Sequence, residues 1–158
     1  MKKLIAVLFI VLVLTGCGSK KKEEKKEFTL DNTSWVGTLN DGVEFEDEKI
    51  KLYQNEKDHS DDYFVGSYKL YLGSEGMNQV EEYNISIDDI KDEIEKNDNY
   101  SEDNFIFVDI KYDYGMVSGE KIEMYASPIP WYGFVLEDGN TLYVTNINTG
   151  AKLKFTRK

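Results

Sequence analysis

The sequence predicts an all-β, mainly antiparallel domain, built as a small up-and-down barrel of about eight strands with one inserted amphipathic helix. Short segments alternate apolar and polar side chains, as a strand with one buried face does. Aromatic residues, which favour strands, are frequent, with 11 Tyr, 8 Phe and 2 Trp among 158 residues. Turn signals at Asp138-Gly139 and Thr149-Gly150 separate the later segments at the spacing of hairpins.

Three strands are expected in the first half of the domain, at residues 35–39, 43–53 and 63–72. Within the second segment the apolar face changes parity near Asp47-Glu48. A bulge or a turn is expected there, because one extra residue moves every later side chain to the other face. In the third segment, Gly66 lies on the apolar face, which is typical of a sharp bend at a barrel corner.

Five further strands are expected at residues 105–114, 121–126, 131–136, 141–147 and 151–156. In the segment 131–136 the alternation places Tyr132 and Phe134 on one face, which we expect to point into the barrel. The aromatic side chains expected inside the barrel, from all of these strands, are Phe64, Tyr68, Tyr112, Tyr132 and Phe134.

One segment, at residues 86–96, has helical periodicity instead. Ser86 followed by Asp89 resembles a capping box with Asp in place of Glu. Isoleucines recur at positions i, i+3 and i+7, which places them on one face of a helix. The segment is therefore expected to form an amphipathic helix, either as a plug at one end of the barrel or as a lid over a ligand mouth.

The first 27 residues differ in composition from the rest. Lys2 and Lys3 precede an uncharged run at residues 4–15, which is shorter than the roughly 20 apolar residues of a spanning helix and suits a secretion signal. Residues 18–27 contain five Lys, three Glu and no apolar residue, as a disordered tether does. We expect a signal peptide at 1–16, a tether at 17–27 and one domain at 28–158.

The tetrapeptide Leu14-Thr15-Gly16-Cys17 resembles the lipobox of bacterial lipoproteins. The resemblance implies that the chain is cut ahead of Cys17 and that this cysteine gains a diacylglyceryl group. Two acyl chains anchor a protein stably, so the domain would stay on the outer face of the cell membrane. The alternative is an ordinary signal peptide with a chance cysteine. The excess of Lys over Arg, 18 to 1, slightly favours a Gram-positive bacterium.

The expected domain is strongly acidic. Residues 28–158 carry 27 Asp and Glu against 12 Lys and Arg, a formal charge of −15. This balance argues against nucleic-acid binding, which needs a basic face. It fits either attraction to a cationic partner or solubility alone.

No motif for catalysis or for a cofactor is found. The one histidine, His59, has no second His or Cys in the domain with which to form a zinc site. Gly73-Ser74-Glu75-Gly76 lacks one residue of a nucleophile elbow, and the acidic segment 98–103 has Tyr where an EF-hand needs Asp or Asn. We expect no enzyme activity, no cofactor and no metal, while a calcium site of another kind at 58–62 or 98–103 stays open.

The two ends of the domain carry a second resemblance. Residues 30–37, LDNTSWVG, and 153–158, LKFTRK, are similar to the lipocalin-like lipoproteins of bacteria, members of the calycin group. In that family a Trp opens the first strand and a basic residue near the last strand packs over it. Trp35 and Arg157 match, and the resemblance implies that a guanidinium over the indole closes the barrel. Thr33 departs from the family, which has Gly there.

Two hypotheses of function follow. In the first, the barrel of a membrane-anchored lipoprotein holds a small amphipathic or lipid-like ligand, lined by the five interior aromatic residues named above. In the second, side chains fill the barrel and its acidic outer face binds a cationic protein or peptide, as an inhibitor would. The interior volume of the barrel discriminates between them.

Overall fold

The computed structural model describes residues 28–55, 62–124 and 128–158. Its strands are β1 Thr33–Gly37, β2 Gly42–Glu46, β3 Lys49–Tyr53, β4 Tyr63–Leu72, β5 Phe105–Val117, β6 Glu120–Glu123, β7 Trp131–Leu136, β8 Thr141–Asn146 and β9 Lys152–Arg157. The described helices are α1 Gly73–Glu81, α2 Ile87–Glu95 and two short 3-10 segments, η1 Glu102–Asn104 and η2 Glu137–Gly139. The signal peptide, Cys17, the tether and His59 lie outside the described residues.

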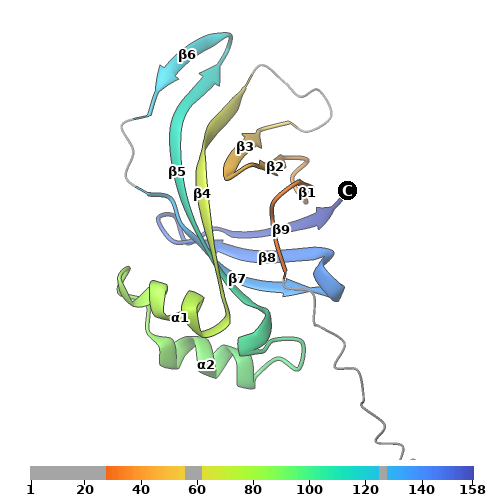
Figure 1. The fold of residues 1–158 in the computed structure, drawn as a ribbon, viewed down its shortest axis with the longest axis vertical. Coiled ribbons are helices and arrows are strands. Elements are labelled where there is room, and N and C mark those ends of the chain that lie inside the picture. Colours follow the sequence, from red (N-terminus) through yellow and green to blue (C-terminus); the bar gives the residue numbers. More distant parts are fainter. Residues whose placement is uncertain (1–27, 56–61, 125–127) are drawn as a thin grey trace, which may run out of the picture.

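Eight strands form a closed antiparallel barrel. The strand order is β4-β3-β2-β1-β9-β8-β7-β5, and β5 pairs back onto β4. Apart from β6, each strand pairs with its predecessor and successor in the chain, and β1 pairs with β9 to complete the ring. The up-and-down barrel that the sequence predicts is therefore confirmed (Figure 1).

The eight barrel strands are not the eight predicted segments. The segment 43–53 forms two strands, β2 and β3, joined by a turn in which Asp47 and Glu48 both have positive φ. This turn explains the change of parity. The segment predicted at 121–126 contributes β6, which pairs only with the outer part of β5 among the described strands and stands outside the ring. Residues 125–127 lie outside the described residues.

The pairing of β4 with β5 is irregular at Gly66, the position where the sequence predicts a bend. Val65 pairs with Tyr114 while Gly66 pairs with Tyr112, so β5 has one extra residue at this point. A Cβ atom on Gly66 would lie 2.2 Å from the carbonyl oxygen of Lys111. Only glycine fits where the two strands approach so closely.

The helix predicted at 86–96 is confirmed as α2. Ser86 is its N-cap, and the Ser86 hydroxyl accepts a hydrogen bond of 3.4 Å from the Asp89 amide. Helix α1 is not predicted from the sequence, because the glycines of its first turn are typical of loops. Gly76 is there for packing, since a Cβ atom would lie 2.9 Å from the carbonyl oxygen of Tyr71.

The two helices cover the outer wall of the barrel beside β5 and β7 (Figure 1). The cluster between helices and wall consists of buried side chains from both, namely Met77, Val80, Ile90, Phe105, Phe107 and Phe134. Helix α2 is therefore neither a plug nor a lid, and both predicted roles are wrong. No helix in the described part of the chain is long and apolar enough to cross a bilayer.

Candidate functional site

The barrel interior is occupied by side chains. Phe64, Tyr68 and Tyr112 belong to the interior cluster, as predicted. The ring of Tyr68 meets that of Phe45 edge to face with centroids 4.8 Å apart, and the Phe64 and Tyr112 centroids are 5.7 Å apart. These contacts leave the three predicted residues packed against other side chains.

Two predicted interior residues point outward. Tyr132 and Phe134 belong to the cluster beneath the helices, while Trp131 and Val135 are the β7 side chains inside the barrel. The alternation correctly separates the two faces of β7. It cannot say which face is inner, because α1 and α2 bury the outer face as well.

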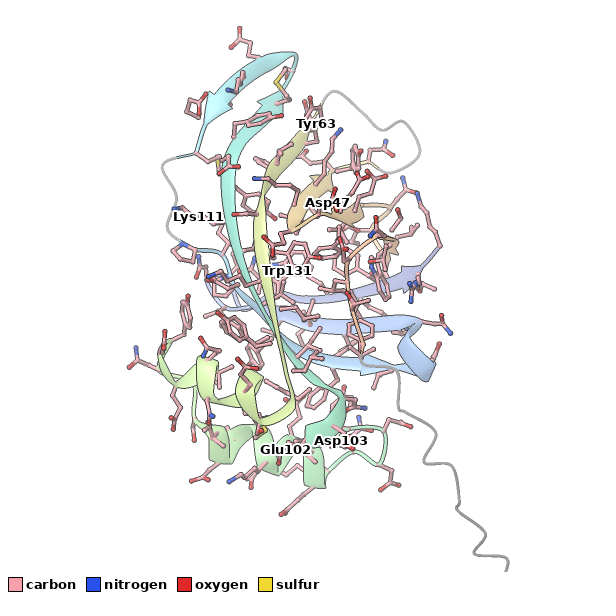
Figure 2. The ribbon with its side chains drawn as sticks, in the orientation of Figure 1. Asp47, Tyr63, Glu102, Asp103, Lys111 and Trp131 are labelled. Carbon is pink, nitrogen blue, oxygen red and sulfur yellow. The ribbon has the colours of Figure 1, made fainter. Side chains whose placement is uncertain are left out.

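Trp131 contributes a polar atom to the interior (Figure 2). Its ring stacks on Phe155 with centroids 5.6 Å apart. The indole Nε1 is buried and has no hydrogen-bond partner in the described part of the chain. Burial also raises the pKa of the Tyr112 phenol. The interior thus holds two polar groups, the Trp131 indole N–H and the Tyr112 hydroxyl, among buried apolar side chains.

The predicted contact between Trp35 and Arg157 is present. The two residues are register partners on β1 and β9, and the guanidinium Cζ lies 5.8 Å from the indole centroid. Trp35 is fully buried, and its Nε1 donates a 2.7 Å hydrogen bond to the Thr33 hydroxyl, which donates in turn to the Leu30 carbonyl. This chain of contacts fixes the end of the barrel at which Leu30 is buried.

An open groove of about 470 Å³ lies beside β4 near the same end. Acidic, aromatic and apolar side chains line it together with one lysine, and these are Asp31, Glu48, Tyr68, Lys69, Leu70, Tyr71 and Glu75. Three carboxylates and one ammonium give the groove a formal charge of −2. A second groove, of about 430 Å³, adjoins it through Leu70 and Glu75 and continues past Phe28 and Thr29. We call the first of these the acidic groove.

The carboxylates of the acidic groove come from three separate segments. Asp31 precedes β1 and is held in place, because its Oδ1 accepts a 2.7 Å hydrogen bond from the Asp47 amide. Glu48 lies in the turn between β2 and β3, and Glu75 lies in the first turn of α1. Sequence reasoning missed this site, because no local pattern indicates that these three segments meet.

The acidic groove differs in charge from the groove next to it. A neighbouring groove of about 400 Å³ on the outer wall also includes Glu48, but its three carboxylates are balanced by three lysines. No group of three or more His, Cys, Asp or Glu side chains close enough to hold a metal ion is found in the described residues. The acidic groove thus presents three carboxylates from separate segments around one open space.

The fold and this groove define the class of the protein as an eight-stranded antiparallel barrel with an acidic surface site. Comparison with protein families, with curated proteins and with solved structures finds no match for this chain.

Proposed function

We propose that this protein is an interaction module that binds a cationic protein or peptide at the acidic groove. One observation carries the proposal: the barrel interior is packed with side chains, while the open space beside β4 is acidic. A cationic ligand would gain from the −2 charge of the groove and from the −15 charge of residues 28–158. Such complementarity steers association and selects partners.

The proposal is tested by calorimetric titration of the full-length protein, held in a neutral detergent, with a capped seven-residue peptide of alternating Lys and Thr. We expect binding at low salt that weakens roughly tenfold or more between about 0.05 M and about 0.5 M NaCl, because salt screens exposed charges. The matched peptide with Glu in place of Lys should not bind. A complete lack of binding at low salt, or equal binding of both peptides, would contradict the proposal.

A small amphipathic ligand inside the barrel is a second candidate, favoured by the unpaired Nε1 of Trp131 and by the buried phenol of Tyr112. Such a ligand would supply the missing hydrogen bonds, and it would have to displace packed rings to enter. Native mass spectrometry of protein purified without added lipid tests it. A bound mass that survives exchange of detergent supports this candidate, and the apo mass alone opposes it.

We also propose that the domain acts outside the cytoplasm, anchored to the bacterial cell membrane by lipid on Cys17. The lipobox-like residues 14–17 support this proposal, and they lie outside the described residues. Cells fed a radiolabelled fatty acid should label the wild-type protein and leave Cys17→Ser unlabelled. Equal labelling of both proteins, or of neither, would contradict lipidation at this cysteine.

A further inference from the structure

The part of β4 that borders the acidic groove has a strand on only one side. β3 pairs with β4 from Tyr63 as far as Ser67, whereas β5 continues beside β4 as far as Leu72. No described strand pairs with the other side of residues 68–72. This stretch is therefore a strand edge within an otherwise closed barrel.

The backbone N–H and C=O of Leu70 face the side of β4 that has no partner strand among the described residues. The Tyr68 amide donates a 3.0 Å hydrogen bond to the Glu48 carbonyl, on the side where β3 lies. Alternate residues of a strand direct their N–H and C=O groups to the same side. The N–H and C=O of Leu70 therefore point to that side as well, beyond the end of β3, and Leu70 lines both adjoining grooves. Such an edge accepts an extended peptide as an added strand.

The acidic groove is also lined by a largely buried tyrosine, Tyr68. Tyr68 is 8% exposed, lines the groove, and its hydroxyl makes no hydrogen bond within the described part of the chain. Burial, together with the charges of Asp31 and Glu48, raises the pKa of Tyr68 to about 12. The phenol is therefore protonated at neutral pH, and its oxygen can accept a hydrogen bond from a cation.

We propose that an extended cationic segment of a partner protein adds to β4 along residues 68–72, with hydrogen bonds to the backbone of Leu70. A Lys or Arg side chain of that segment lies between the carboxylates of Asp31 and Glu48 and contacts the Tyr68 hydroxyl. This inference rests on the proposed function and gives it a binding mode. Charge selects the occupant, because a neutral strand would leave the −2 charge of the groove unpaired.

The strand geometry is tested on the peptide, so that the fold of the protein is not at risk. Two forms of the Lys-Thr peptide are made, one N-methylated at the odd residues and one at the even residues. An added strand uses alternate amides, so one form should lose about tenfold or more in affinity while the other binds like the parent. Parent-like binding of both forms would overturn strand addition.

The place of binding is tested on the protein with matched variants. Glu48→Gln and Tyr68→Phe should each weaken peptide binding by about threefold to tenfold, because each removes a partner of the cation. Their controls are Glu120→Gln on β6, which is exposed, and Tyr112→Phe, whose phenol is buried elsewhere in the barrel. Both controls should bind like the wild type.

The possible failures are distinguishable. Equal weakening by Glu48→Gln and Glu120→Gln would overturn the groove as the site and would leave cation binding by the surface in place. Wild-type affinity of both Glu48→Gln and Tyr68→Phe would likewise overturn it. A wild-type protein that does not bind the parent peptide would overturn the proposed function and this inference together.

Discussion

Tyr68 connects the barrel interior with the acidic groove. Its ring packs on Phe45 inside the barrel, and its hydroxyl lies where the groove opens. A hydroxyl that borders an open groove and makes no hydrogen bond within the protein adds little to the stability of the free protein. In a complex, a bound cation could donate a hydrogen bond to the hydroxyl oxygen of Tyr68. Tyr53 is the contrasting case, because its hydroxyl donates a 2.9 Å hydrogen bond to Glu44.

This contrast gives a prediction for stability. Tyr68→Phe should change the free energy of unfolding by less than about 0.5 kcal/mol, whereas Tyr53→Phe should lower it by about 1 kcal/mol, the net worth of a hydrogen bond. Urea unfolding of the two variants beside the wild type measures both values. A loss for Tyr68→Phe as large as that for Tyr53→Phe would show that the Tyr68 hydroxyl already has a structural partner.

The raised tyrosine pKa values predict a loss of stability in alkali. Phenols of an unfolded chain ionise near pH 10. Burial raises the pKa of Tyr53, Tyr68 and Tyr112 in the folded protein, with Tyr68 at about 12. The contribution of these protonated phenols to the free energy of unfolding is therefore fully present below pH 10. It is lost as the pH rises towards 12, because the unfolded chain then binds fewer protons than the folded protein. Phenolate absorbance and circular dichroism between about pH 9 and about pH 12.5 should show delayed ionisation that coincides with unfolding. Ionisation of all tyrosines near pH 10 in a folded protein would contradict this burial.

At the scale of elements, the helices stabilise the barrel wall from outside. Ile90 of α2 is buried against the outer cluster, whereas Ile122 of β6 is 47% exposed. Ile90→Ala should lower the free energy of unfolding by about 2–4 kcal/mol through lost burial and a new cavity. Ile122→Ala, its control, should cost well below 1 kcal/mol. Denaturant unfolding compares them, and equal losses would mean that α2 is not docked on the wall.

The helices and strands could be predicted from the sequence wherever a local pattern of residues determines them. The strand alternation and the Ser86 cap have local causes, and the structure has both of them. Helix α1 was missed, because Gly76 is needed for close packing on Tyr71, which no local pattern reveals. The faces of β7 were assigned the wrong way round, because both are buried. The acidic groove could not be predicted, since Asp31, Glu48 and Glu75 meet only after the barrel closes.

In the whole molecule, the barrel leaves open space at its surface beside β4. The ring of eight strands is closed, buried side chains pack against one another inside it, and the acidic groove lies beside β4. The break in pairing beside residues 68–72 is the point where a closed barrel still offers a strand edge. Excess negative charge at that point would favour cationic segments over others.

Strand addition at β4 is tested by hydrogen–deuterium exchange of the full-length protein with and without the Lys-Thr peptide. A strand added to β4 would protect the Leu70 amide and shield the groove, so exchange should slow in fragments that cover residues 28–31 and 66–72. Fragments from β8 and β9 should exchange as they do in the free protein. Slower exchange confined to β7, β8 and β9, or no change at residues 66–72 at a saturating peptide concentration, would contradict the claim.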